Sequence, residues 1–288
     1  MAVTSEHIAI AELVIYIPVT LVTILVVLRH GFHKQLGWIY LSIFGVIRIA
    51  GAIMEILSTN HPDNANDKEW ALILQSVGLS PLLLSTLGLL KRIISIFSKR
   101  ATAISRRSKI VQILHLPALI ALILAISGGS DQASSNVSDH AGGKKETQAA
   151  IIIFLMIYVI TCLLFVITVK DLREMQPSQQ RIYICVFFAL PLIAVRLLYS
   201  LISDFGHDAK FSLIDGDPSV QLGMATIEEF LVVLMYTVLG VITPQSSIDR
   251  AVGGGIVAPD VHALEDGRTE NQDAYFAQAG ARSAYYAK

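Results

Sequence analysis

Two side chains of opposite charge, Arg48 and Glu55, lie within one apolar segment, Trp38 to Leu57, that is long enough to cross a membrane. A charge at that depth costs at least about 3 kcal/mol, so it normally faces a protein interior or a water-filled cavity and has a partner there. The seven-residue spacing puts both on roughly the same helix face but about 10 Å apart along the axis. Each therefore needs a partner from another helix. Charges of this kind usually mark a substrate, ion or proton site.

The composition identifies the class of protein that positions these charges. The chain of 288 residues is 53% hydrophobic and 16% charged, with a mean hydropathy of +0.60. Such a composition is typical of a polytopic membrane protein and excludes an ordinary soluble domain. It leaves no basic surface for nucleic acid. Both cysteines lie inside apolar runs, which favours buried thiols over a disulfide or metal framework. We expect no metal and no cofactor.

Seven apolar runs pass the length test for a membrane-spanning helix. They are Ile8 to Leu28, Leu36 to Leu57, Trp70 to Leu90, Ile110 to Ile126, Ala149 to Val169, Ile182 to Ile202 and Ala225 to Ile242. The sequence therefore predicts an all-α bundle of seven transmembrane helices over 1–243. The polar, Ala-rich remainder, 244–288, is predicted to be a mostly disordered tail.

The loop charges orient these helices. The connections after the first, third and fifth runs hold twelve basic residues, against four after the second, fourth and sixth. The twelve are Arg29, Lys34, Lys91, Arg92, Lys99, Arg100, Arg106, Arg107, Lys109, Lys170, Arg173 and Arg181, and the four are Lys68, Lys144, Lys145 and Lys210. Basic loops stay cytosolic, so we predict an extracytoplasmic N-terminus and a cytosolic C-terminus. Asn136, in a glycosylation sequon, then lies on the extracytoplasmic side.

That orientation assigns a depth to each intramembrane polar residue. Arg48 lies near the midplane, and the others gather in the outer half of their spans: Glu12, Glu55, Gln75, Arg196, Tyr199, Asp204, Glu228 and Glu229. This clustering predicts a polar cavity near the extracytoplasmic face, lined mainly by the second, third, sixth and seventh helices. We expect Arg196 to pair with Glu55 or with one of Glu228 and Glu229, and Arg48 with a deeper group. Because Glu228 and Glu229 differ by about 100° around the helix, only one should face the cavity.

Two interpretations of this cluster remain open. In the first, the ion pairs serve only to fix helix register. In the second, acids outnumber cations, so desolvation and like charges keep one carboxyl protonated as a general acid.

The size, the seven spans and the isolated acids Glu55, Glu228 and Glu229 resemble small fungal seven-span membrane proteins and, loosely, the membrane-bound terpene cyclases of meroterpenoid biosynthesis. That resemblance implies acid-initiated cyclisation of a lipophilic prenylated substrate in an endomembrane such as the endoplasmic reticulum. Glu55, Glu228 and Glu229 are then the candidate catalytic acids. Arg48, Arg196, Tyr199 and Gln75 are the candidate substrate-binding residues, and Phe44, Tyr199 and Phe230 offer π faces to a carbocation.

The alternative is a non-enzymatic receptor-like protein or lipid exporter that binds a ligand in the same pocket, at the plasma membrane if it is a receptor. The chain has no Asp-Arg-Tyr after the third span, no Asn-Pro-x-x-Tyr in the seventh and no lysine there to hold retinal. Likeness to rhodopsin-like receptors therefore rests on helix count alone.

Overall fold

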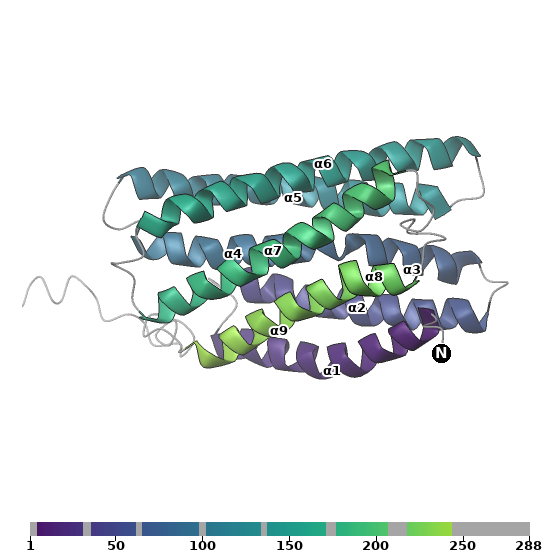
Figure 1. Cartoon of the computed structure of the whole chain (residues 1–288), viewed down its shortest axis with the longest axis horizontal. Coiled ribbons are helices and arrows are strands. Elements are labelled where there is room, and N and C mark those ends of the chain that lie inside the picture. The colour runs from purple at the N-terminus through teal and green to yellow at the C-terminus, as the bar shows by residue number, and fades with distance from the viewer. Residues whose placement is uncertain are drawn as a thin grey trace, which may run out of the picture. The chain divides into compact units, whose positions relative to one another are not determined.

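The apolar runs form helices in the computed structural model (Figure 1), which describes residues 5–30, 36–61, 65–97, 102–133, 137–170, 177–206 and 218–243. The helices are α1 (Ser5–His30), α2 (Leu36–Asn60), α3 (Ala65–Val77), α4 (Leu79–Phe97), α5 (Thr102–Ala133), α6 (Val137–Thr168), α7 (Pro177–Phe205), α8 (Pro218–Gln221), the π-helical turn η3 (Leu222–Thr226) and α9 (Ile227–Ile242). The described ranges contain no strand, so the all-α prediction is confirmed there. Asn136 and the predicted tail lie outside them.

Six helical segments in the described ranges are long and apolar enough to cross a membrane: α1, α2, much of α5, α6 and α7, and Leu222–Ile242. Their outer faces carry large exposed apolar side chains such as Val14 on α1, Leu116 on α5 and Leu163 on α6. Contiguous apolar surface on this scale requires lipid or a protein partner to cover it. The protein is therefore a multi-pass membrane protein.

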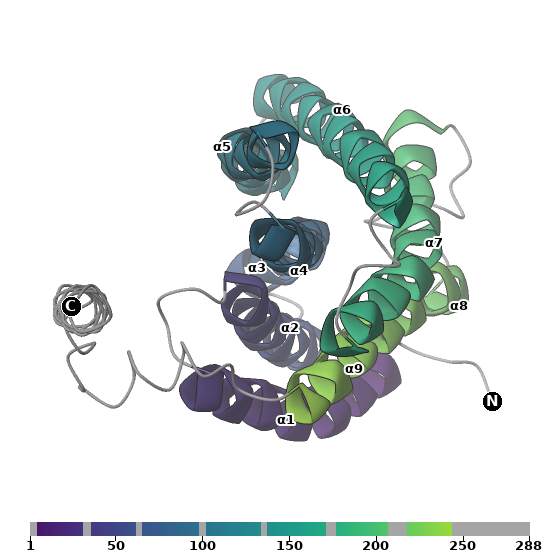
Figure 2. The ribbon, with the colours of Figure 1, turned by 90° about the vertical axis from the view of Figure 1, so that its left-hand side faces the viewer.

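The third predicted span, Trp70 to Leu90, is divided between α3 and α4. Gly78 separates the two helices, and Pro81 lies in the first turn of α4. Proline has no N–H to donate to the carbonyl four residues earlier, so a continuous helix would lose a hydrogen bond here, whereas the first turn of a new helix tolerates it. In Figure 2, α3 and α4 lie almost in line, so together they occupy the place of one interrupted helix in the bundle.

Helix α4 lies inside the bundle and packs against α2, α5, α6 and α7 (Figure 2). Most of its side chains from Leu79 to Ile94 are buried, including the hydroxyl residues Ser80, Ser85 and Thr86. The Thr86 hydroxyl lies 2.9 Å from the Tyr236 hydroxyl of α9. The hydroxyls of Ser85 and Thr86 also donate to the Leu82 carbonyl, so both are satisfied within the protein, whereas the buried Ser80 hydroxyl has no hydrogen-bond partner among the described residues.

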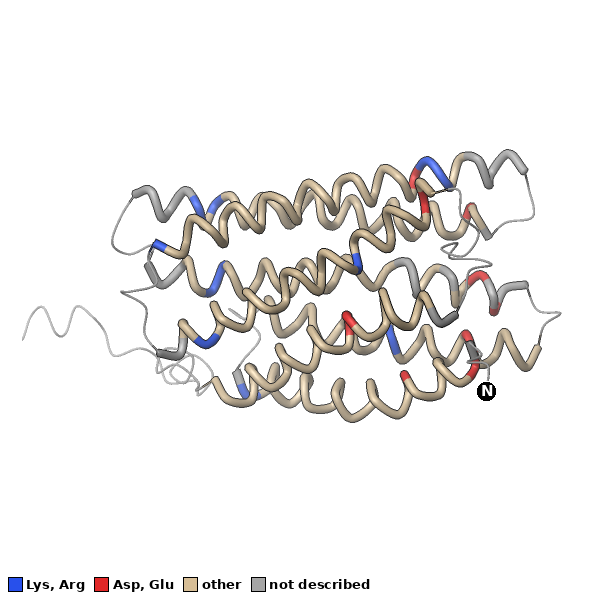
Figure 3. Tube along the Cα trace, viewed as in Figure 1, with Lys and Arg blue, Asp and Glu red and all other residues tan. Residues whose placement is uncertain are grey.

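Charged residues separate between the two ends of the bundle (Figure 3). Basic residues dominate the end where α1 and α9 finish, and the hydrogen bond from Arg29 to the Val241 carbonyl joins those two helices there. Most acidic residues of the described trace lie toward the other end. This separation agrees with the excess of basic residues in alternate loops, from which the orientation of the helices is predicted.

Helices α2 and α4 cross with their backbones in contact at Gly37 and Gly88. A Cβ placed on Gly88 would lie 2.4 Å from the Gly37 nitrogen and 2.6 Å from its Cα. Small residues permit this kind of approach between membrane helices. Any side chain at Gly88 would therefore push α2 away from α4.

We expect Gly88→Ala to destabilise the protein by about 1–3 kcal/mol, because relief of the clash requires two packed helices to separate. The measurement is thermal unfolding in detergent. Gly142→Ala on α6 is the matched control, since a Cβ there meets nothing within 4 Å. That change should be neutral or stabilising by up to about 1 kcal/mol, because alanine is the better helix former. Equal unfolding temperatures for the two variants would contradict the close crossing.

Candidate functional site

The buried carboxylate of Glu229 on α9 binds two arginines from two other helices. Its Oε2 accepts a hydrogen bond from Arg48 Nη2 on α2, and its Oε1 accepts one from Arg196 Nε on α7 at 2.5 Å. Glu229 is 0% exposed, Arg48 3% and Arg196 2%. Charges this deeply buried are stable only when paired and hydrogen-bonded. Glu229 therefore fixes α2, α7 and α9 relative to one another.

A fourth charge, Glu12, brings α1 into the same network. Its Oε1 lies 3.7 Å from Arg48 Nη1 and accepts a hydrogen bond of 3.1 Å from Thr226 Oγ1, at the end of η3. The four residues Glu12, Glu229, Arg48 and Arg196 carry two negative and two positive charges, so the network is electrically balanced.

Neighbouring polar and aromatic groups also contact the two arginines. Arg196 Nη1 donates to Ser200 Oγ at 2.7 Å. The guanidinium of Arg48 lies over the Phe44 ring at 5.8 Å, and that of Arg196 over the Tyr199 ring at 5.7 Å. Both are cation–π distances. Phe44 and Tyr199 therefore each present a ring face to an arginine.

Local backbone features make room for this network. A Cβ on Gly78, at the break between α3 and α4, would lie 3.2 Å from Glu229 Oε1 and 3.5 Å from the Phe44 ring. The missing side chain thus leaves space for the carboxylate. On the opposite side, the chain enters α9 through the π-helical turn Leu222–Thr226. Single π-helical turns often occur at functional sites.

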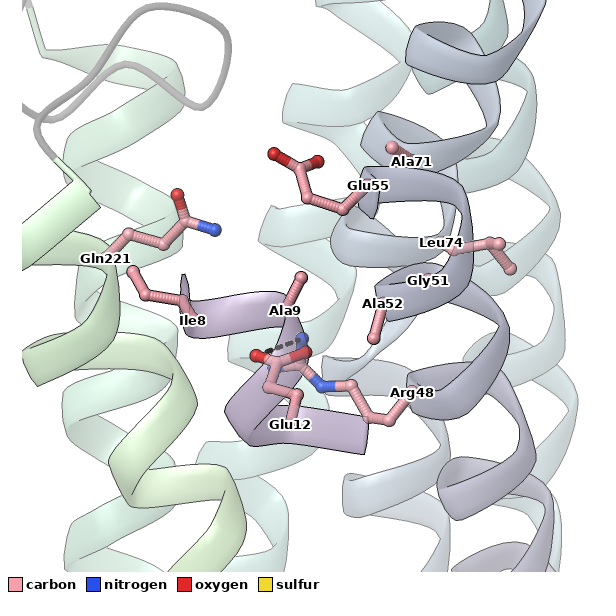
Figure 4. A pocket seen from close by; sticks show the side chains of 10 residues that line it. All are labelled: Ile8, Ala9, Glu12, Arg48, Gly51, Ala52, Glu55, Ala71, Leu74 and Gln221. Carbon is pink, nitrogen blue, oxygen red and sulfur yellow. Dashed lines mark ion pairs between the residues drawn. The ribbon is translucent and has the colours of Figure 1, made fainter. Parts of the chain in front are cut away.

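A pocket opens beside the network, between α1, α2, α3 and the end of α8 (Figure 4). Glu12, Arg48, Glu55 and Gln221 supply its polar groups. Its apolar walls are Ile8, Ala9, Gly51, Ala52, Ala71 and Leu74. The cavity volume is about 30 Å³, which is room for about two water-sized groups. We refer to these ten residues as the head pocket.

The structure places the predicted site residues in or beside the head pocket and the ion-pair network. Arg48 and Glu55 line the head pocket, and Arg48 also belongs to the ion-pair network with Glu229 and Arg196. Tyr199 contacts Arg196, and Glu228 is half-buried beside Glu229. The side chain of Gln75, in α3, lies outside the described residues. The prediction that Arg196 pairs with one of several named acids is confirmed, with Glu229 as the partner.

The predicted cavity walls differ from the observed ones. We expected mainly the second, third, sixth and seventh helices, but α1 and α8 replace the last two in the head pocket. The sequence predicts that Glu12 lies in the outer half of its span but does not assign it to the site, although it is an acid in an apolar run just as Glu55 is. Gln221 precedes the seventh predicted span, so its contribution had no signal in the sequence.

Comparison with known protein families gives a match to the family described as Domain of unknown function (DUF7702), over residues 3–246. No curated protein and no solved structure matches the chain.

We expect Glu229→Gln to lower the amount of folded protein several-fold, because it leaves two buried arginines without their shared carboxylate. Removing one partner of a buried ion pair costs roughly 3–5 kcal/mol, enough to change abundance. Quantitative immunoblotting of membranes provides the measurement. The control Glu228→Gln removes a neighbouring charge that binds neither arginine in the described contacts, and should change abundance little.

Adding Arg196→Met to Glu229→Gln should restore part of the lost abundance. In the double variant Arg48 still has Glu12 as an ion-pair partner, and the second buried cation has been removed. Equal abundance of the Glu229→Gln and Glu228→Gln variants would show that the network does not hold the helices together.

Proposed function

The chain belongs to the DUF7702 family, and we propose that it is a non-enzymatic membrane protein, receptor-like or lipid-exporting, that holds the polar head of an amphiphilic small molecule in the head pocket. The apolar remainder of the ligand lies against lipid-facing helix surface. On α1, the exposed side chain Ile10 follows directly after the pocket residues Ile8 and Ala9, and the exposed Val14 lies about one turn further along.

The size of the head pocket is the observation that carries this proposal. Pockets that enclose a drug-sized ligand measure about 300–1,000 Å³, whereas the head pocket measures about 30 Å³. It admits a few non-hydrogen atoms, and a coiled polyprenyl chain needs far more space. Four polar side chains around so small a volume suit the recognition of a head group.

The charge balance supports binding rather than acid catalysis. Acid catalysis needs a carboxyl that can donate its proton, but Glu229 is engaged by Arg48 and Arg196. Of the three candidate acids, Glu55 alone lines the pocket. The aromatic rings of Phe44 and Tyr199 already face guanidinium groups.

We further propose a topology of seven spans, with α3 and α4 together forming the third. The predicted excess of basic loops on one side and the basic end of the bundle in Figure 3 support an extracytoplasmic N-terminus and a cytosolic C-terminus. In that orientation the head pocket lies toward the extracytoplasmic side. A plasma-membrane location suits a receptor, and an endomembrane suits an exporter.

Filling the head pocket should abolish ligand binding without changing any charge. Ala52 is 2% exposed and lines the pocket, so Ala52→Leu places three additional carbon atoms in the cavity. We expect purified Ala52→Leu protein in lipid nanodiscs to lose saturable binding of radiolabelled octyl amphiphiles that the unmodified protein retains. Gly142→Ala, far from the pocket, is the control. Unchanged saturable binding in Ala52→Leu would exclude the head pocket as the binding site.

The second candidate is the terpene cyclase, and one observation favours it: Glu55 shares the pocket with apolar walls formed by Ile8, Ala52 and Leu74. Membranes that contain the protein would then consume epoxidised or unepoxidised farnesyl aryl compounds. Glu55→Gln would abolish turnover while folded protein stayed at a near-normal level. Mass spectrometry measures how much of each compound remains. If the unmodified protein consumes neither compound, this candidate is ruled out.

A further inference from the structure

We propose that the basic ends of α4 and α5 bind a membrane lipid whose head group carries more than one phosphate. These ends lie on the side of the bundle where Lys and Arg residues gather (Figure 3), away from the head pocket. The inference therefore goes beyond the proposed function and does not depend on it. It follows from the level of four cations on the two helices, the apolar surface beside them and the lack of acidic partners among the described residues.

Four basic residues lie at one level on two neighbouring helices. Helices α4 and α5 pack against each other and run in opposite directions from a short connection. The four lie five to seven residues from the ends of their helices at that connection: Lys91 and Arg92 on α4, and Arg107 and Lys109 on α5. At about 1.5 Å per residue, each is about 8–10 Å from the end of its helix. The two helices therefore bring four positive charges to the same distance from the connection.

This level is the edge of the lipid-facing surface of α5. Lys109 is exposed, and the next residue, Ile110, is an exposed apolar side chain. The exposed side chains of Ile113, Leu116 and Ile120 then continue the face of Lys109 along the helix, because spacings of three and four residues keep side chains on one face. A lipid that places its phosphates at Lys109 thus has apolar surface directly below for an acyl chain.

The two lysines at this level have no acidic partner. Helix α4 contains no Asp or Glu, and the first acid of α5 is Asp131, near its other end. Among the described residues neither Lys91 nor Lys109 forms an ion pair. Lys91 is half-buried and lies on the α5 side of α4, since its charge acts on His115. Like charges repel most strongly where water is partly excluded, so an anionic ligand stabilises this end of the two helices.

The number of cations favours a head group with several phosphates. Arginine and lysine are the side chains that bind phosphate oxygens best. A phosphodiester lipid such as phosphatidylserine carries a single net negative charge, whereas each phosphate monoester adds a charge of about −1.5 to −2. Clusters of four or more basic residues at the cytoplasmic end of membrane helices are typical of sites for such lipids. A phosphorylated inositol lipid therefore matches the four cations with one molecule.

The test measures lipid binding to the purified full chain in detergent by native mass spectrometry. The probes are phosphatidylinositol bisphosphate, phosphatidylserine and phosphatidylcholine, all with two oleoyl chains, and soluble inositol trisphosphate, which has the phosphates but no chains. We expect one molecule of the bisphosphate lipid to bind at least about tenfold more tightly than phosphatidylserine. Phosphatidylcholine and inositol trisphosphate should each bind at least about tenfold more weakly than the bisphosphate lipid, because one lacks the charge and the other the chains.

Two double variants assign the binding to α4 and α5. Each basic residue beside an anionic head group contributes about fivefold in affinity. Lys91→Gln combined with Lys109→Gln should therefore weaken binding of the bisphosphate lipid about 25-fold. The matched control is Lys170→Gln combined with Arg181→Gln, which removes two exposed positive charges near the same end, directly after α6 and on α7. The control should bind the lipid within about twofold of the unmodified protein, because most of its charge lies beyond the screening distance of about 8 Å.

Three results would overturn the inference. Equal affinity for phosphatidylserine and the bisphosphate lipid would show that several phosphates are not recognised. Equal affinity for inositol trisphosphate would show that the ligand is a free phosphate compound and not a lipid. An equal loss in both double variants would show that the basic end attracts anions as a whole, without a site at α4 and α5. The series of lipids needs no variant, and Lys109→Gln alone changes only an exposed side chain, so the test decides even if the Lys91 variant fails to fold.

Discussion

The double ion pair of Glu229 with Arg48 and Arg196 is the constraint on which the arrangement of the described helices depends. Between membrane helices apolar contact gives little discrimination, because lipid tails are as apolar as the helix faces. A helix that slides or rotates loses little packing energy, but it leaves a buried charge without its ion-pair partner. Removing one partner of a buried pair costs roughly 3–5 kcal/mol, so only one register of α2, α7 and α9 satisfies all three side chains. The ion pairs thus contribute more to the uniqueness of the fold than to its net stability.

That register can form only because the helices approach closely at defined points. Gly78 leaves space for the Glu229 carboxylate beside the Phe44 ring. At the other end of α9, a Cβ on Gly240 would lie 2.7 Å from Val26 and 3.1 Å from the Trp38 ring, so α9 can lie against α1 and α2 along its length. Packing and electrostatics therefore depend on each other. The glycines set the distance between helices, and the ion pairs set which residues meet at that distance.

The sequence predicts the features that depend on the length of apolar runs and on the positions of charges. It does not predict the features that depend on how each helix is rotated about its axis. The apolar runs predicted the membrane-length helices, and the depth of the ionisable residues predicted that Arg196 and Glu229 could meet. The 100° offset between Glu228 and Glu229 predicted that one of them would face inward. The choice between them, the inclusion of Glu12 and the contribution of Gln221 depend on the rotation of each helix about its own axis. Amphipathic periodicity normally reveals that rotation, but here lipid-facing and buried faces are both apolar.

The sequence also does not predict the break at Gly78, because a proline within a span is compatible with either a kinked helix or two helices.

Glu12 belongs to both the ion-pair network and the head pocket. A ligand in the pocket would therefore act on the side chain that attaches α1 to the network. Arg48 is held by Glu229 whether or not Glu12 contributes, whereas Glu12 contacts Arg48 at the longer distance of 3.7 Å. A ligand held in the head pocket, as we propose, would lie beside both Glu12 and Arg48, so α1 is the helix whose attachment it would change most. The same helix reaches the basic end of the bundle, where Arg29 donates a hydrogen bond to the Val241 carbonyl of α9. A ligand shifts a conformational equilibrium only by its difference in affinity for the two states. Glu12 is the side chain at which such a difference can arise, because its partners lie on α2, at η3 and in the pocket at once.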